Sequence, residues 1–437
     1  MNKYQSYKPS GVEWVGEIPE KWRISKFKYV SKLYTGNSLN DEQKVLYESD
    51  DEYHIPYVSS KDIDLNTRSV NYNNGLRIPK ENNPLKVSPK DSFLLCVEGG
   101  SSGRKMVYLD REVCFVNKLC SFKSVENTRF QYYFIQSSNF QDKFRLSLSG
   151  LIGGVSISTL RDFELVLPSI QEQLQIVQFL DEKTELIDKL ISTKDRKITF
   201  LKEQRSSLIN QVVTKGLNPN VKMKDSGVEW IGEIPEDWGF VKVGHYTNVV
   251  RGGSPRPSGD SRFFNGDFIH WITVKEVTSK NGKYIVDTDS KLTEEGMKQS
   301  RVLEPETLVL SNSGATLGVP GILKIRGCIN DGVVSFLKIS NKVFRDFLYY
   351  FWTTQTSILL EQQSGYGQPN LNIEIVSNIK FPLPTMEEQI LIVEYIESKT
   401  TEIDDLVQLE QKKIDLLKEY RQSLISEVVT GKIKVTN

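Results

Sequence analysis

Cysteine and histidine are scarce in this sequence. The 437 residues include four cysteines (Cys96, Cys114, Cys120 and Cys328) and three histidines (His54, His245 and His270). No two cysteines have the C-x-x-C spacing of a zinc or redox site, and no histidine pattern accompanies them. The sequence therefore argues against a metal centre, and the cysteines in apolar stretches are expected in the core.

Net charge and long apolar runs are also absent. The 56 Lys and Arg residues balance 56 Asp and Glu residues, so any basic surface must be local. No apolar run approaches the roughly 18 residues of a membrane helix, and the N-terminal MNKYQSYKPS has no apolar signal-peptide core. We expect a cytoplasmic protein of ordinary globular composition that does not engage a membrane.

Catalytic motifs are missing as well. The segment GGSSGRKM (99–106) comes nearest to a phosphate-binding loop but lacks its Lys-Ser/Thr pair, and there is no G-x-S-x-G elbow. The Glu-x-Lys triplets at 397–399 and 410–412 lack an acidic partner on a strand, so we interpret them as solvated helix faces. These absences argue for a protein that is not an enzyme.

What the sequence does contain is a long internal repeat. Of the 13 positions in Ser10–Trp22 (SGVEWVGEIPEKW), 11 are identical in Ser226–Trp238 (SGVEWIGEIPEDW), 216 residues later. Leu167–Gly216 recurs at the same offset as Leu383–Lys432, with 23 identities in 50. A repeat of this size indicates a duplicated domain, since solenoid repeats span about 20 to 50 residues.

The conserved long segments are predicted to be helices. Ser169 with Glu172, and Thr385 with Glu388, have the spacing of capping boxes, and apolar residues then recur every three or four positions until Gly216 and Gly431. A helix of this length, about 65 Å, needs a partner along its apolar stripe. Its own copy, antiparallel through a pseudo-twofold, is the simplest partner; the alternative is that each helix folds back onto its own domain.

The stretches between the conserved segments diverge, yet both predict the same mixed α/β fold. Short strands are expected at DFIHWITV, KYIVD, TLVLSNS, GILKI and VVSFLKI in the second half, followed by a helix at 343–363. The first half repeats this with DSFLLCV, KMVYLD and CSFKSV and a helical segment at 129–144. We therefore predict an α+β protein of two related mixed α/β domains, 1–166 and 217–382, separated by two long antiparallel helices at 167–216 and 383–437.

Two related domains held apart by paired helices suit a double-stranded DNA target. Sites on one face of a duplex recur every helical turn, about 34 Å, and a twofold protein matches sequences of opposite orientation on the two strands. If the two domains differ, the two half-sites should differ.

The sequence resembles the specificity subunit of a Type I restriction-modification system over nearly its whole length. The motifs that carry this resemblance are GVEWVGEIPEKW and GVEWIGEIPEDW, RGGSPRPSGD (251–260), SGYGQPNLN (364–372), LPSIQEQ and LPTMEEQ, and the helix ends KEQRSSLINQVVTKG and KEYRQSLISEVVTGK. The resemblance implies two target recognition domains that each read half of a bipartite, asymmetric DNA site, with a spacer set by the helices.

The resemblance also implies partners. Two methyltransferase subunits would pack on the helices and domains, and motor-nuclease subunits would join for cleavage. S-adenosylmethionine, ATP and magnesium would then be used by those partners, and this chain would bind no cofactor. A relative of another assembly type, whose partner fuses nuclease and methylase, fits the same chain.

DNA contacts are expected from cations and amides in loops, because Lys and Arg bind phosphates and Arg, Lys, Asn and Gln read base edges. In the second half we expect contacts from Arg251, Ser254, Arg256, Arg262, Lys275, Asn312, Ser313, Thr316, Tyr366 and Gln368. The first half has TGNSLND (35–41) and acidic ESDDE (48–52) where the second has RGGSPRP, so its contacts are expected elsewhere. They are Lys61, Arg68, Tyr72, Asn74, Arg77, Arg104 and Lys105.

Two other functional classes stay open on the sequence alone. A bivalent scaffold that binds a protein at each end would have the same architecture, but the loops expected at its ends are polar and basic rather than apolar. An enzyme is the third possibility, and it would alter DNA unaided.

Overall fold

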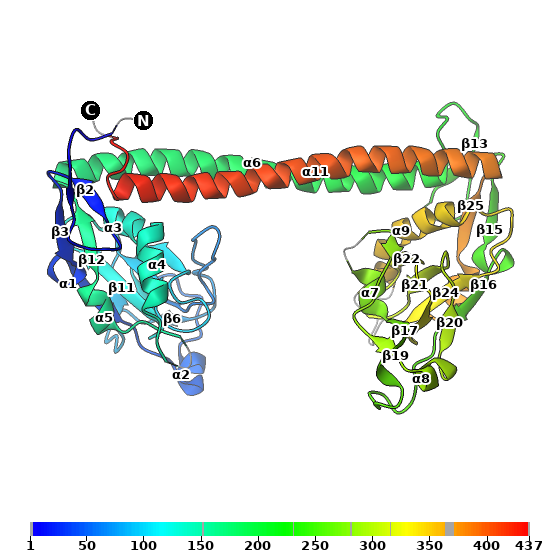
Figure 1. Ribbon diagram of the computed structural model, residues 1–437, viewed down its shortest axis with the longest axis horizontal. Coiled ribbons are helices and arrows are strands. Elements are labelled where there is room, and N and C mark those ends of the chain that lie inside the picture. Colours follow the sequence, from blue (N-terminus) through cyan, green and yellow to red (C-terminus); the bar gives the residue numbers. More distant parts are fainter. Residues whose placement is uncertain are drawn as a thin grey trace. The chain divides into compact units, whose positions relative to one another are not determined.

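The computed structural model describes residues 3–150, 153–229, 231–279, 282–314, 316–362 and 371–435. The chain divides into two units (Figure 1). The first unit comprises Met1–Asp195 and Gln411–Asn437, and the second comprises Arg196–Glu410. The two long helices therefore contribute a segment to each unit.

The described residues of the first unit form two four-stranded sheets, two two-stranded sheets and a group of short helices. One four-stranded sheet has the order β4-β11-β8-β9, and the other has the order β6-β5-β10-β7 with β10 parallel to β5. Its strands are β1 (Tyr7–Pro9), β2 (Glu17–Pro19), β3 (Arg23–Lys26), β4 (Ser31–Thr35), β5 (Ile55–Val58), β6 (Arg77–Ile78), β7 (Val87–Ser88), β8 (Phe93–Cys96), β9 (Met106–Tyr108), β10 (Val113–Phe115), β11 (Leu119–Ser124) and β12 (Glu164–Leu167). Its short helices are α1 (Phe27–Val30), α2 (Asp41–Leu46), α3 (Thr128–Phe134), α4 (Ser138–Leu146) and α5 (Ile157–Asp162).

The second unit repeats this order. Its sheets run β16-β24-β21-β22-β18 and β19-β17-β23-β20, with β17 parallel to β23. The strands are β13 (Met223–Asp225), β14 (Glu233–Pro235), β15 (Gly239–Lys242), β16 (Asn248–Arg251), β17 (Phe264–Ile272), β18 (Tyr284–Ile285), β19 (Lys291–Leu292), β20 (Arg301–Leu303), β21 (Leu308–Ser311), β22 (Pro320–Leu323), β23 (Gly327–Ile329), β24 (Val333–Leu337) and β25 (Lys380–Leu383). The helices are η1 (Val243–His245), α7 (Val274–Thr278), α8 (Glu294–Lys298), α9 (Arg345–Gln362) and α10 (Ile373–Asn378).

Each domain has three layers, and a central strand shows why. Successive side chains of a strand point to opposite faces. In β8, Phe93 and Leu95 pack on the helical layer, where the Phe93 and Phe122 rings stack 4.6 Å apart, while Leu94 and Cys96 pack toward the second sheet. Strand β21 divides its side chains in the same way. A strand covered on both faces reads as an uninterrupted apolar run, as FLLC and LVLS do.

The long helices begin and end where the sequence predicts. Helix α6 spans Ile170–Lys215 and α11 spans Met386–Val429. The hydroxyls of Ser169 and Thr385 each accept a hydrogen bond, both 3.3 Å, from the backbone N–H three residues on. Gly216 and the Gly431 that follows α11 adopt positive φ, the conformation that ends helices.

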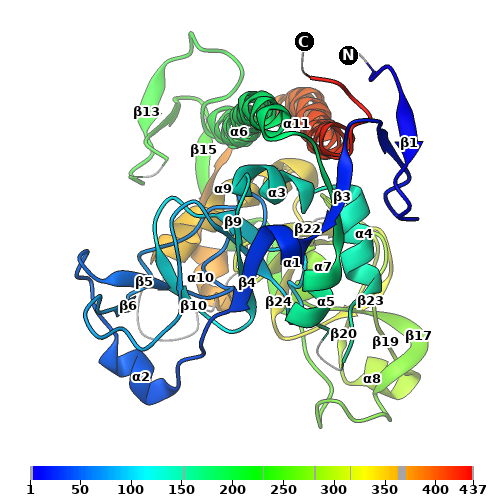
Figure 2. The same cartoon turned by 90° about the vertical axis from the view of Figure 1, so that its left-hand side faces the viewer.

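The two helices lie side by side (Figure 2), and they run antiparallel, since each unit contains the start of one helix and the end of the other. In the first unit Arg421 Nε donates to Asp188 Oδ1 at 2.9 Å, and in the second Arg205 Nε donates to Asp404 Oδ2 at 3.2 Å. The start of one helix and the end of the other share each core. Ile176 and Leu180 lie with Ile425 and Val429 in the first unit, and their counterparts 216 residues away lie together in the second.

The predicted mixed α/β domains and paired antiparallel helices are thus confirmed, and folding of each helix onto its own domain alone is wrong. The interpretation of the second Glu-x-Lys triplet, 410–412, also needs correction. Glu410 is only 3% exposed and binds Lys197 Nζ at 2.9 Å, while Glu397 binds Lys283 at 2.7 Å. The Glu410 carboxylate thus lies in a packed surface instead of facing solvent, because helix periodicity does not reveal which faces tertiary contacts cover, whereas Glu397 is exposed as expected.

In each unit the conserved lead segment contacts both long helices through its tryptophan. Trp22 Nε1 donates to Glu172 Oε2 at 3.0 Å, and Trp238 Nε1 donates to Glu388 Oε2 at 3.0 Å. Each indole also lies against the end of the other long helix: a Cβ on Gly431 would lie 3.0 Å from Trp22, and one on Gly216 3.0 Å from Trp238. Each lead therefore joins the start of one helix to the end of the other, and we call this arrangement the tryptophan joint.

Candidate nucleic-acid interface

A tight loop leaves the first long strand of each domain at a glycine. A Cβ on Gly36 would lie 1.8 Å from the Phe115 carbonyl oxygen, and one on Gly252 would lie 2.1 Å from the Asn330 carbonyl oxygen. Each loop is then tied down by a backbone bond, Asn37 N–H to Phe115 O at 2.9 Å and Gly253 N–H to Ile329 O at 3.1 Å. The two domains thus hold different loop sequences on the same backbone crossing, and only glycine permits that approach.

In the second domain this loop gathers three predicted residues around Asp331. Ser254 Oγ donates to Asp331 Oδ1 at 2.6 Å, and Arg256 Nη2 lies 3.3 Å from Asp331 Oδ2. Arg251 Nε donates to the Asp331 backbone carbonyl at 2.6 Å. The guanidinium of Arg256 is 71% exposed, so most of its donors face solvent.

Arg262 and Lys275 are exposed and each has a carboxylate partner. Arg262 Nη2 binds Asp260 Oδ2 at 2.6 Å, and this hydrogen bond lowers the pKa of the Asp260 carboxyl. Lys275 pairs with Asp289, which raises the pKa of the lysine. Both remain cations at neutral pH, and because such exposed pairs are weak, a phosphate can compete for either cation.

The remaining predicted residues of the second domain differ in exposure. Thr316 is exposed and Ser313 is half-buried. Asn312 is fully buried, and among the described residues neither its amide nitrogen nor its amide oxygen has a hydrogen-bond partner. Tyr366 and Gln368 lie outside the described residues.

In the first domain two predicted lysines meet. Lys61 and Lys105 line a cavity of about 470 Å³ together with Asp62, Asp64 and Asn71. Lys105 Nζ donates to the Ser60 carbonyl at 2.7 Å, which holds the lysine at this opening. Arg104 is exposed beside it and donates to the Gly100 carbonyl.

The structure places three other predicted residues of the first domain in internal contacts. Tyr72 donates its hydroxyl proton to Asp110 Oδ1 at 2.7 Å and lies under the Arg111 guanidinium. Asn74 uses both amide atoms to hold its own turn, through Tyr57 O and Leu76 N, and Arg77 is buried.

Arg68 lies at the long helices rather than with the lysines. It lines a cavity of about 880 Å³ that α6 residues Asp181 and Asp188 and the α11 residue Arg421 also line. Its Nη1 atom is buried and has no hydrogen-bond partner among the described residues. Burial lowers the pKa of the Arg68 guanidinium, although arginine stays protonated at neutral pH.

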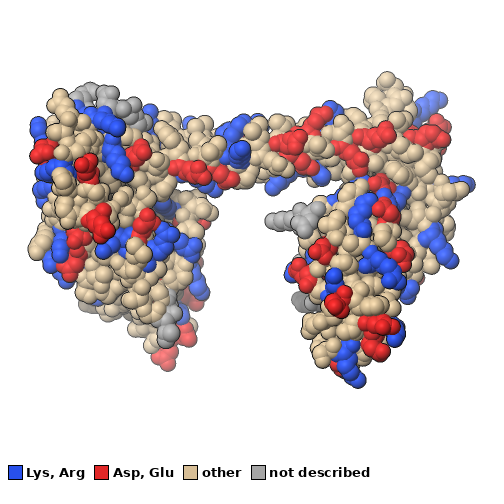
Figure 3. All heavy atoms as spheres, in the orientation of Figure 1, with Lys and Arg blue, Asp and Glu red and all other residues tan. Residues whose placement is uncertain are grey.

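Charge over the visible surface is mixed. Figure 3 shows Lys and Arg interspersed with Asp and Glu on both units, as the zero net charge requires. Local groups such as the Arg251–Arg256 loop therefore carry the positive potential. Sequence reasoning did not single out Asp331, since nothing local to it signals that it meets a loop about 80 positions earlier.

The structure also bears on membrane and metal sites. None of the helices in the part of the chain that the structure describes combines the length and the apolar character that crossing a bilayer requires. The same residues hold no group of three or more His, Cys, Asp or Glu side chains suited to a metal ion.

Comparison with known proteins agrees with this architecture. The family model for the Type I restriction modification DNA specificity domain matches residues 19–199 and again residues 235–429. The chain is 25% identical over 441 residues to the Type I restriction enzyme MjaVIII specificity subunit of Methanocaldococcus jannaschii, covering 96% of this chain and 95% of that protein.

Solved structures share the fold. A chain from work on complex assembly and conformational transition of the type I R-M system superimposes with a TM-score of 0.73 at 16% identity, covering 95% of this chain and 99% of that one. The HsdS subunit from Thermoanaerobacter tengcongensis gives a TM-score of 0.52 at 15% identity, over 95% and 98% of the two chains.

Both halves of the chain thus carry the same fold with different polar loops. The chain belongs to the Type I restriction-modification DNA specificity family, whose model covers both of its halves. It supplies the DNA sequence specificity of such a system, and subunits of this kind do not catalyse the reactions themselves.

Proposed function

We propose that residues 1–166 read one half of a bipartite, asymmetric DNA site and residues 217–382 read the other, while the helices at 167–216 and 383–437 set the spacer. The observation that carries this is the loop pair at Gly36 and Gly252: one backbone crossing, repeated, with different side chains. Different side chains on a common frame are expected to select different bases.

The test is the set of methylated motifs in the host genome with and without this gene. We expect one two-part motif, with unlike halves separated by unspecified bases, to disappear when the gene is removed. A motif that is continuous or palindromic, or one that persists without the gene, would contradict the proposal.

The proposed contacts in the second domain are the loop residues Arg251, Ser254 and Arg256, with Arg262, Lys275, Ser313 and Thr316 beside them. In the first domain they are Lys61, Arg104 and Lys105, because these three side chains reach solvent. We leave Tyr72, Asn74 and Arg77 out of the contact set, since their contacts lie within the protein, and Arg68 because it lies in the cavity at the long helices.

Removing two of these arginines should change the salt dependence of binding. The double substitution Arg251→Ala and Arg256→Ala is expected to weaken DNA binding by the assembled complex. The slope of log K against log salt should fall by about one for each arginine that faces a phosphate. Binding titrations at several salt concentrations measure both. Arg326→Ala, which removes an exposed arginine paired with Glu304, is the control, and an unchanged slope in the double variant would exclude phosphate contact.

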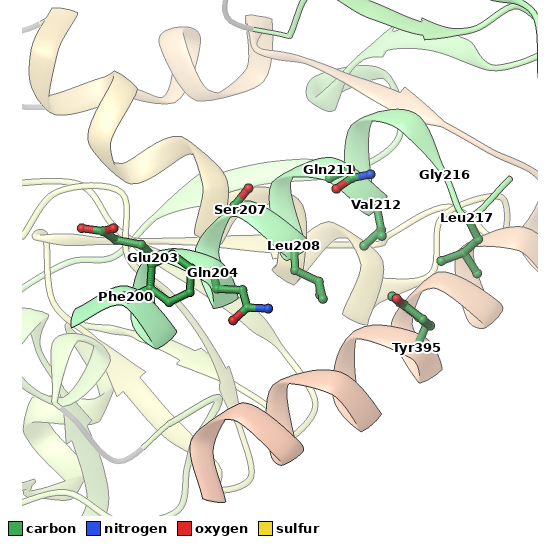
Figure 4. Close-up of a pocket in the computed structure, with 10 residues that line it drawn as sticks. All are labelled: Phe200, Glu203, Gln204, Ser207, Leu208, Gln211, Val212, Gly216, Leu217 and Tyr395. Carbon is green, nitrogen blue, oxygen red and sulfur yellow. The ribbon is translucent and has the colours of Figure 1, made fainter. Parts of the chain in front are cut away.

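The proposed protein partners are modification subunits that dock on the long helices. A groove of about 590 Å³ in the second unit is lined by Phe200 and Leu208 of α6, Leu217 beyond this helix and Tyr395 of α11 (Figure 4). Phe200 is 64% exposed and its counterpart 216 residues later, Leu416, is 55% exposed. An exposed apolar residue repeated at the offset of the duplication supports two copies of one partner, used in the same way.

Docking can be tested on each copy. Phe200→Glu and Leu416→Glu are each expected to weaken binding of the modification subunit by roughly 30-fold, because each removes a central apolar contact worth about 2 kcal/mol. Ser206→Glu adds the same charge to an exposed position of α6 outside the groove and serves as the control. Assembly equal to the control in both variants would exclude this surface.

The same proposal places the chemistry on other subunits. The methyl donor S-adenosylmethionine would be used by the modification subunits, and ATP and magnesium by motor-nuclease subunits. This chain would recognise the DNA sequence and provide the surface on which the modification subunits dock.

A further inference from the structure

Asp331 stands out because one residue holds three parts of the Arg251–Arg256 loop. Its carboxylate accepts the Ser254 hydroxyl and lies beside the Arg256 guanidinium, and its backbone carbonyl accepts Arg251 Nε. The carboxylate is 43% exposed, so it sits at the surface where the loop meets solvent. Further bonds fix the loop from the other side: Arg301 Nε donates to the Arg251 carbonyl at 2.9 Å, and Ser300 Oγ to the Gly253 carbonyl at 2.7 Å.

The first domain provides an internal comparison at the same position. Val116 and Asn330 each donate a backbone bond to the parallel neighbouring strand, at Val58 and Ile272. Two residues later, the carbonyls of Lys118 and Gly332 accept bonds from Val97 and Asn312. The residue between is Asn117 in the first domain and Asp331 in the second.

The loops that face Asn117 and Asp331 also differ in charge. The first-domain loop has Thr35 and Asn40 where the second has Arg251 and Arg256. Where the loop carries arginines the facing turn carries a carboxylate, and where it carries none the turn carries a neutral amide that is exposed. The carboxylate therefore accompanies the arginines rather than the shared fold.

A carboxylate beside an arginine favours the orientations of the guanidinium that keep their contact, while it leaves other donors free. Of the five N–H donors of arginine, the Arg256–Asp331 contact commits one nitrogen. The rest can form the two parallel hydrogen bonds that arginine makes to the O6 and N7 atoms of guanine. A guanidinium fixed before binding loses less conformational freedom on contact, which sharpens its choice of base.

We propose that Asp331 is a positioning residue for sequence reading, and that it holds Arg256 to recognise a guanine in the half-site of the second domain. This deepens the proposed function and rests on it. Arg251, fixed by its Nε at the base of the loop, is assigned to the adjacent phosphate.

The experiment compares substitutions in the assembled complex with the wild type. Duplexes in which each base pair of both half-sites is replaced in turn are competed against the natural site. In Asp331→Asn, which places the first domain's side-chain type at this position, discrimination at one G·C pair of the second half-site is expected to fall about tenfold. All other positions should keep their wild-type ratios.

Arg256→Lys provides the second measurement. Lysine keeps the charge but cannot make the bidentate contact, so the same G·C pair should lose its discrimination while the salt slope stays within about half a unit of wild type. Glu304→Gln, which removes the exposed partner of Arg326, is the matched control and should leave every base preference unchanged.

The outcomes distinguish a failure of the proposed function from a failure of the role proposed for Asp331 and Arg256. If the wild-type complex shows no two-part site, the proposed function fails and this inference with it. If the site exists but its second half has no G·C pair, or both variants keep full discrimination, or specificity weakens equally in both half-sites, then only the role of Asp331 and Arg256 is overturned. If Asp331→Asn does not assemble, Arg256→Lys alone decides.

Discussion

Replacing residues 239–382 with the equivalent segment of another specificity chain should change one half-site of the recognised DNA and leave the other as it was. The Arg251–Arg256 loop and Asp331 both lie in this segment, and the hydrogen bonds described for them involve no residue of the first domain. The expected loss for the old second half-site is about 1–3 kcal/mol for each base pair that no longer matches.

The structure gives a physical reason why such an exchange can fold. The segment begins in β15 and ends in β25, which pair antiparallel from Gly239 with Leu383 to Lys242 with Lys380. Entry and exit thus lie side by side in one ladder, and the first domain has the same ladder between β3 and β12. A transplanted segment must therefore pair in this ladder and pack against α6 and α11.

The reciprocal exchange, of residues 23–166, is the control. It should alter the half-site that the first exchange leaves unchanged. The methylated motif of the host reports both results directly, and a change of both half-sites by either exchange would contradict independent reading by the two domains.

Loss of a tryptophan joint is expected to have the largest effect on stability. Trp238→Ala should lower the free energy of unfolding by about 3–5 kcal/mol, because it empties a large buried site and leaves the Glu388 carboxylate without its indole donor. Trp22→Ala should cost a similar amount, since Trp22 is 1% exposed and makes the same bond to Glu172.

Urea unfolding of the full chain, followed by circular dichroism, measures these changes. Trp238→Phe keeps most of the apolar area and loses the N–H donor, so it should cost less than half as much as Trp238→Ala. Equal stability of Trp238→Ala and wild type would show that the lead segments do not fasten the helix ends.

The fold could be anticipated where local signals repeat. Capping residues, an apolar stripe and terminal glycines bounded α6 and α11 correctly, because these signals depend on neighbours in the chain. The fates of Glu172 and Glu388 could not be foreseen. Their spacing suggested capping boxes, yet their carboxylates bind Trp22 and Trp238 from 150 positions away.

The predicted DNA contacts divide along the same line. The RGGSPRP loop announces itself by composition, and the structure brings Arg251, Ser254 and Arg256 together. In the first domain the choice rested on residue type alone, so it selected Asn74 and Arg77, whose polar groups hold their own turns, alongside Lys61 and Lys105. Residue type tells which atoms can bind DNA, while burial and competing partners decide which are free to do so.

The β3–β12 and β15–β25 ladders, where the chain enters and leaves each domain, suggest how whole domains could be exchanged between genes. The lead before β3 or β15 has 11 identities in 13 between the two halves of the chain, and the segments that follow β12 and β25 share 23 identities in 50. Homologous recombination between such flanks would deliver an entire domain with its ends already matched. A change in the DNA sequence that the complex recognises would then require two crossovers and no further change in the exchanged domain.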